Sequence, residues 1–365
     1  MYSINEIFRT FGPEYMASFG ASMPNDHKKV IKAIMECRTK TCGLVVYECI
    51  KCGVQHISFR SCGNRHCPAC QNHKIKQWVE VQMNRQLPGH HFMITFTVPE
   101  QLRRFIRSNQ RAAYEALFKA SSQTMKGLTP DPKYIGGDLP GFFGVLHTWG
   151  RQLQYHPHIH YIVTGGAILK EDGSWHPSRI DFYLPVRAMS KIFRAKFCEE
   201  MKKAGLFSRI PASAWKIAWN VNCQAVGNSE TSIKYLAPYV FKVAITDHRI
   251  VKVEGRDVFF KYKKTGSERW RTMKLEAMEF LRRFLQHVLP TGFMKVRYYG
   301  FLSPSSSVDL DHIRQLMESA YGIKAVELLT GPETVLPSLI CPECGGELKY
   351  SYSVLPHQMI PDDAG

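Results

Sequence analysis

Negative charge is scarce in this sequence. Its 365 residues carry 31 Asp and Glu against 48 Lys and Arg, so the formal net charge is +17 at pH 7. Such a charge favours a polyanionic partner, because each phosphate that a protein neutralises releases counterions. The composition therefore favours nucleic-acid binding over an enzyme for small neutral substrates, and a merely basic soluble surface is the alternative.

Long apolar runs and internal repeats are missing too. No stretch reaches the ~18 apolar residues that a membrane span needs, and the first twenty residues mix charges among apolar side chains, unlike a signal peptide. We therefore expect an intracellular, cytoplasmic protein without a membrane partner, whose cysteines are metal ligands or free thiols rather than disulfides. Hydrophobic residues at 44% and aromatic residues at 12% exclude a dominantly disordered chain.

Hydrophobic periodicity divides the chain into three expected parts: a helical start with a cysteine-rich module (1–85), a mixed α+β domain with an antiparallel sheet (86–303), and a linker with a tail (304–365). Within them, helices are predicted at 1–36, 74–85, 103–126, 191–206, around 235 and at 273–288. Alternation predicts a strand from residue 90 and hairpins at 141–166 and 249–264. The tail from residue 327 holds six acids and one base.

Seven of the eleven cysteines lie between Cys37 and Cys70. They include two C-x-x-C pairs, and such a turn directs two thiolates at one point. We therefore predict one structural zinc site, closed to substrate by a full thiolate shell, with these four ligands: Cys49, Cys52, Cys67 and Cys70. Further candidate ligands, for this ion or for a second one, are Cys37, Cys42, Cys62, His56 and His66.

A late C-x-x-C pair, Cys341 and Cys344, is half of a metal site. It needs His357, another chain or N-terminal ligands to close. An unliganded, reactive pair of thiols is the alternative.

Three histidines follow one another in the segment 156–160. Residues i and i+2 of a strand face the same side, so His158 and His160 project together while Ile159 enters the core. Two such imidazoles can hold one divalent ion and leave positions for substrate oxygens. A surface run of histidines is the alternative.

The hairpin suggests a third ligand. If its turn centres near residues 152–153, His158 faces His147 across the ladder, with Cβ atoms about 5 Å apart. Gln152 and Gln154 are the alternatives, and their oxygens would suit Mg²⁺ better.

Two tyrosines, Tyr235 and Tyr239, are spaced to share one face of a helix. Core packing is the ordinary explanation of such a pair. Beside a metal-binding histidine pair, however, a tyrosine oxygen can attack a phosphodiester, while a metal stabilises the developing charge.

Taken together, the motifs resemble those of the two-tyrosine HUH transposases of the insertion-sequence-91 family, named for histidine–hydrophobic–histidine. The resemblance covers most of the chain through the ordered blocks SFRSCGNRHCPACQ, HHFMITFTVPEQLR, LHTWG with YHPHIHYIVTGG, YLAPYVFKVAI, FLRRFLQHVLPTGFMKVRYYGFLS and the tail CPECGG. It implies an HUH endonuclease domain with a central antiparallel sheet, preceded by a small zinc-binding module.

The activity that the resemblance implies is rolling-circle transposition by single-strand cleavage and strand transfer. His158 and His160 are then ligands of Mg²⁺ or Mn²⁺, and Tyr235 and Tyr239 form 5′-phosphotyrosine links. One departure is Pro238, which clashes inside a helix and is tolerated in its first turn, so we expect the helix to start near it.

The expected partners are single-stranded or hairpin DNA of the transposon ends and target DNA. Candidate DNA-binding cations are Arg65, Lys74, Lys242, Lys263 and Arg297. Two other functions remain open from the sequence: a rolling-circle replication initiator or relaxase, and a non-catalytic zinc-dependent DNA-binding regulator.

Overall fold

The computed structural model describes residues 2–85, 87–227, 244–264, 266–322 and 339–356. The chain forms two compact units, and each is assembled from separate chain segments. The first contains Met1–Lys74, Ile245–Val288 and Leu328–Gly365, and the second contains Ile75–Ala244 and Leu289–Glu327. The sequence, by contrast, suggested contiguous parts. Both units mix helices with antiparallel sheets, so the predicted α+β class is confirmed.

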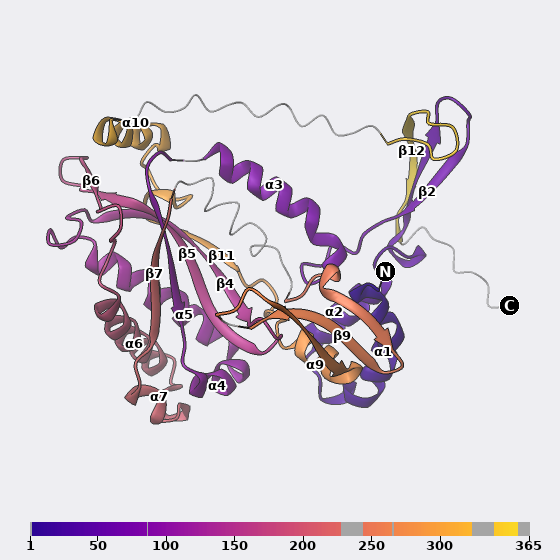
Figure 1. The fold of residues 1–365 in the computed structure, drawn as a ribbon, viewed down its shortest axis with the longest axis horizontal. Helices are drawn as coiled ribbons and strands as arrows, with labels where there is room; N and C mark the ends of the chain where they lie inside the picture. The colour runs from indigo at the N-terminus through magenta and orange to yellow at the C-terminus, as the bar shows by residue number, and fades with distance from the viewer. Residues whose placement is uncertain (1, 86, 228–243, 265, 323–338, 357–365) are drawn as a thin grey trace. The chain divides into compact units, whose positions relative to one another are not determined.

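The second unit is built on one antiparallel sheet with the order β11-β4-β5-β3-β7, and β6 pairs with β5 (Figure 1). Its strands are β3 (His91–Thr97), β4 (Leu139–Trp149), β5 (Tyr155–Ile168), β6 (Trp175–Pro177), β7 (Asn220–Gly227) and β11 (Val296–Tyr299). The predicted hairpin is confirmed as β4–β5, and β5, which carries the histidine run, is the middle strand of this order.

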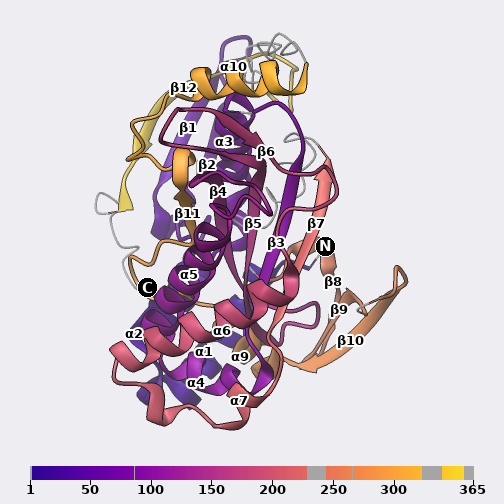
Figure 2. The same cartoon turned by 90° about the vertical axis from the view of Figure 1, so that its left-hand side faces the viewer.

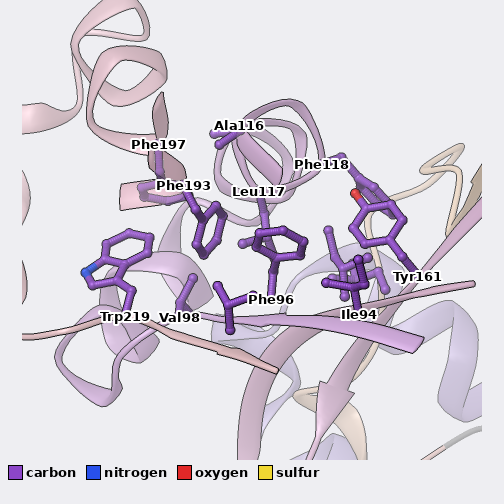
Figure 3. Close-up of a cluster of buried hydrophobic side chains, with 14 of the residues drawn as sticks. Ile94, Phe96, Val98, Ala116, Leu117, Phe118, Tyr161, Phe193, Phe197 and Trp219 are labelled. Atoms are coloured by element: carbon purple, nitrogen blue, oxygen red, sulfur yellow. The ribbon is translucent and has the colours of Figure 1, made fainter. Parts of the chain in front are cut away.

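Helices α5 and α6 pack against one face of this sheet (Figures 1 and 2). The helices of this part of the chain are α3 (Gln71–Asn84), α4 (Arg103–Ser108), α5 (Gln110–Leu128), α6 (Val186–Lys203), α7 (Ser213–Lys216) and α10 (Leu310–Tyr321). Figure 3 shows Phe96 of β3 in one cluster with Leu117 of α5 and Phe193 of α6, and all three side chains are fully buried. Burying one such side chain stabilises the folded state by about 1.5–3 kcal/mol.

Strand alternation then decides which side chains face away from α5 and α6. Along β5, Ile159 and Tyr161 enter the core shared with these helices, so His158 and His160 face the other way. The same alternation on β3 turns Thr95 to the face of the two histidines, because its neighbours Ile94 and Phe96 belong to that core. The fold thus gathers polar groups on one face of the central strands.

The first unit combines helices with two small sheets. Its helices are α1 (Ile4–Phe19), α2 (Asn25–Glu36) and α9 (Ala277–Leu285), and its sheets have the orders β12-β1-β2 and β10-β9-β8. The strands are β1 (Leu44–Cys49), β2 (Gln55–Phe59), β8 (Ile250–Glu254), β9 (Asp257–Lys263), β10 (Trp270–Glu276) and β12 (Leu348–Val354). Phe8 of α1 packs edge-on against Phe284 of α9 at 5.0 Å between ring centroids, which joins segments far apart in the sequence.

The segments predicted as single helices at 1–36 and 103–126 are each divided into two helices, α1 with α2 and α4 with α5, and two other predicted elements also differ from the structure. The helix expected from Met273 begins only at Ala277, because residues before it pair with β9 and the Glu276 carboxylate caps the helix by accepting the backbone N–H groups of Met278 and Glu279. The linker expected after residue 303 contains α10, which buries Ile313 and Met317 one helical turn apart. In the described part of the chain, none of the helices is both long and apolar enough to cross a membrane.

Candidate metal and DNA-processing site

Three histidines converge on neighbouring central strands. His147 of β4 is paired with His158 of β5, as the expected turn position predicted. One ring nitrogen of each of His147, His158 and His160 lies within 4.8 Å of the others. This histidine trio therefore brings together the two histidines of the predicted metal-binding pair and His147, the candidate third ligand.

Hydrogen bonds orient two rings of the trio. Nδ1–H of His158 donates to the carbonyl oxygen of His156 at 2.6 Å, which leaves the lone pair of this ring on Nε2. The hydroxyl of Thr95 lies 2.9 Å from Nδ1 of His160 and can accept a hydrogen bond from Nδ1–H, in which case the lone pair of this ring also lies on Nε2. Partners of this kind fix the tautomer and the direction of metal-binding imidazoles.

Burial keeps the rings of His158 and His160 neutral. It lowers the pKa of His160 to about 4, and it lowers the pKa of His158 well below the ordinary value, with the neighbouring His160 adding to the effect. His147 is 2% exposed and His158 is 9% exposed. Neutral imidazole is the form that binds metal, so the donor set fits a divalent ion at neutral pH.

A cationic and an aromatic side chain lie beside the trio, and sequence reasoning missed them. Nη2 of Arg103 lies 2.9 Å from Nδ1 of His156, whose ring is 5.1 Å from that of His158. In addition, Trp149 stacks on His147 with the ring centroids 5.0 Å apart. The alternation of β3 could have predicted that Thr95 faces the histidines. No sequence pattern, however, links Arg103 to a histidine 53 residues away.

The remaining candidates around this site fall in two groups. The alternative ligand Gln154 uses its Oε1 to accept the backbone N–H of Gln152 inside the turn. Tyr235, Tyr239 and Pro238 lie outside the described residues. The tyrosine pair therefore stays a prediction from the sequence.

The cysteines form two clusters, with a pairing that the spacing did not predict. The N-terminal cysteine cluster consists of Cys37, Cys62, Cys67 and Cys70, and the split cysteine cluster consists of Cys49, Cys52, Cys341 and Cys344. In each cluster the four Sγ atoms lie within 4.8 Å of one another. The prediction that the two early C-x-x-C pairs share one shell is wrong, because β1 carries the first pair to β12 while Cys37 and Cys62 join the second pair.

Each cluster contains one thiol with a lowered pKa. In the N-terminal cysteine cluster, a hydrogen bond from the thiol of Cys62 lowers the pKa of Cys67 to about 5. In the split cysteine cluster, a backbone hydrogen bond at Cys52 lowers the pKa of Cys49 to about 6. The thiolate is the form that binds metal. His66 and Cys42 belong to neither group of four among the described residues.

The predicted DNA-binding cations are scattered. Arg65 is exposed and its Nε donates to Nε2 of His66 at 3.4 Å, and Lys263 pairs with Glu268. Arg297 pairs with both carboxylate oxygens of Glu115 at 2.7 Å and lies over the ring of Phe118 at 4.3 Å, so it also serves the packing of its unit. Lys242 and the side chain of Lys74 lie outside what the structure describes.

Comparison with known proteins identifies relatives over most of the chain. Residues 141–308 match a family described as "Putative transposase", and residues 7–98 match a family described as "Transposase zinc-binding domain". The "Putative transposase y4qJ" of Sinorhizobium fredii is 36% identical over 319 residues, which cover 82% of this chain and 80% of that protein. The "Transposase for insertion sequence element IS801" of Pseudomonas savastanoi pv. phaseolicola is 27% identical over 296 residues, covering 75% and 70%. No solved structure matches the chain with significance.

Proposed function

The chain belongs to the insertion-sequence-91 family of transposases, and from this premise we propose that it moves DNA by single-strand cleavage and strand transfer along a rolling-circle route. The membership confirms the resemblance inferred from the motifs, and it makes the protein an enzyme that acts on DNA. The observation that carries the finer proposal is the histidine trio, which lies within the region of the transposase match.

The trio is the proposed site of the catalytic ion. His147, His158 and His160 would hold Mn²⁺ or Mg²⁺, and three imidazole nitrogens suit Mn²⁺ better than Mg²⁺, which prefers oxygen ligands. Such an ion, when bound, stabilises the negative charge that develops on a scissile phosphate. Thr95 and the carbonyl of His156 keep the rings aimed at one point.

Residues beside the trio would position the DNA backbone. The guanidinium of Arg103 lies against His156 and also pairs with Glu100 at 3.0 Å, so its charge is held at the edge of the trio. A guanidinium so placed can donate two hydrogen bonds to phosphate oxygens. Arg103 is therefore the proposed contact for a phosphate beside the cleaved one.

Tyr235 and Tyr239 are the proposed nucleophiles. The phenolic oxygen of one tyrosine attacks the phosphorus and forms a phosphotyrosine ester, while the bond from phosphorus to the 3′-oxygen breaks. The phenol loses its proton in this step, and the 3′-oxygen takes up a proton and leaves as a hydroxyl, while the 5′-phosphate stays on the protein. A later attack by a 3′-hydroxyl of another strand reverses these bond changes and releases the tyrosine.

Structural zinc is supported by the zinc-binding family match and by the cysteine clusters. Because four thiolates leave no open position on the ion, this zinc would stabilise the fold rather than take part in the reaction.

The function can be tested with single-stranded DNA from the ends of the element. His158→Ala and His160→Ala should each abolish Mn²⁺-dependent cleavage and the covalent adduct on a denaturing gel, while binding of the same DNA stays nearly unchanged. His312→Ala, on the exposed side of α10, is the matched control and should cleave as the parent does. Persistent cleavage in either trio variant at low metal concentration would refute the assignment of the metal site.

A further inference from the structure

The split cysteine cluster joins parts of the chain that are almost 300 residues apart. The Sγ atoms of Cys49 and Cys344 are 3.4 Å apart, and those of Cys52 and Cys341 are 3.9 Å apart. All four sulfur atoms lie within 4.8 Å of one another, inside a single compact unit. This spacing suits four thiolates around one ion, and it is much longer than the ~2.05 Å of a disulfide.

The two C-x-x-C turns of this cluster have the same backbone geometry. In each, a glycine directly after the second cysteine has a positive φ, 72° at Gly53 and 70° at Gly345. The N–H of that glycine donates to the carbonyl of the first cysteine at 2.9 Å in both turns. Two turns of one shape, facing each other through their thiols, form the two halves of a tetrahedral shell.

The second glycine of the CPECGG segment allows the close approach. A Cβ atom at Gly346 would lie 2.9 Å from Sγ of Cys49 and 3.3 Å from Sγ of Cys344. In addition, Nε2 of His56 lies 3.2 Å from Sγ of Cys341 and can donate a hydrogen bond to its thiolate. The surroundings thus leave room for the four sulfurs and support their negative charge.

We propose that the split cysteine cluster binds a second structural zinc ion, which fastens β12 to β1. The zinc-binding family match spans residues 7–98 and contains the whole N-terminal cysteine cluster, but it contains only Cys49 and Cys52 of the split one. The second site is therefore closed by the late pair, Cys341 and Cys344. A tetrahedral shell of four soft thiolates suits zinc, and the zinc-binding family match favours zinc over iron.

The sheet around this site has little buried apolar area to stabilise it. The strands β2 and β12 bury few side chains: Ile57 is 63% exposed, Tyr350 is 63% exposed and Tyr352 is 48% exposed. A small sheet with so little buried apolar area does not offset the conformational entropy of ordering its strands. Metal binding supplies folding free energy directly, so the ion would keep β12 paired with β1.

Zinc content per chain tests the proposal. The purified full chain should hold two zinc ions by elemental analysis, and Cys341→Ser/Cys344→Ser should hold one. Cys198→Ser/Cys223→Ser removes two thiols outside the clusters and should keep both ions. One ion in the parent, or two in the Cys341→Ser/Cys344→Ser variant, would overturn the proposal, as would a disulfide found at these cysteines in the parent.

A second measurement keeps the test decisive if that variant does not fold. Cobalt can replace zinc in the parent chain, and absorption from thiolate-to-cobalt charge transfer should then saturate at two equivalents. Saturation at one equivalent would contradict the second site. Neither readout depends on DNA cleavage, so the result stands whether or not the histidine trio is catalytic.

Discussion

The hydroxyl of Thr95 offers a sharp test of how the histidine trio is oriented. It lies 2.9 Å from Nδ1 of His160, on the neighbouring strand. Thr95→Val keeps the β-branched shape that suits β3 and removes only the hydrogen bond. The His160 ring then loses the hydroxyl that can accept a hydrogen bond from its Nδ1–H and so hold the lone pair on Nε2.

The expected effect is a loss of metal affinity. Removing a partner that orients a metal ligand typically costs about 10–100-fold, which corresponds to about 1.4–2.7 kcal/mol. The Mn²⁺ concentration for half-maximal cleavage of single-stranded DNA should therefore rise by that factor, whereas the maximal rate at saturating Mn²⁺ should fall less.

Two further variants separate orientation from packing. Thr95→Ser keeps the hydroxyl but loses the methyl group, so it should restore metal affinity if the hydrogen bond is what matters. Thr272→Val makes the same change at an exposed position of β10 and should have no effect. An unchanged Mn²⁺ requirement in Thr95→Val, or a serine variant as weak as the valine one, would refute the reasoning.

Two other predictions concern the tyrosines and a buried histidine. Tyr235→Phe and Tyr239→Phe should each still give a DNA adduct, in unequal amounts, and the double variant should give none on a denaturing gel; a surviving adduct would place the nucleophile elsewhere. Burial lowers the pKa of His91 from 6.5 to about 4, so between these pH values only the unfolded chain binds a proton at this residue. The free energy of unfolding should therefore fall as the pH drops from 6.5 toward 4, by up to about 3 kcal/mol. Urea unfolding followed by tryptophan fluorescence should show a shallower pH dependence in His91→Phe, and an equal slope would count against this explanation.

Local patterns predicted well the face of the sheet that carries the histidine trio. The alternation around His158 and the position of the turn were enough to place His147 opposite it, because register in an antiparallel hairpin follows from the turn. The same alternation separates the trio from the core. These are short-range properties, and the sequence carries them directly.

The pairing of the cysteines could not be read from spacing. Cys67 finds its partners at Cys37 and Cys62, and Cys49 finds its partners near the other end of the chain, although 14 residues separate the two early pairs. Which thiols meet depends on how β1 pairs with β12, a long-range contact without a local signal. Arg103 beside His156 was missed for the same reason.

The order of the strands in the sheet β12-β1-β2 has a consequence for synthesis of the chain. β1 leaves the ribosome early with β2, but its other edge is covered only by β12, which is made about 300 residues later. At roughly 5–20 residues per second, that edge is open for roughly 15–60 s in every nascent chain. An open strand edge pairs readily with strands of other chains. Aggregation of this protein should therefore begin between nascent chains on the same polysome.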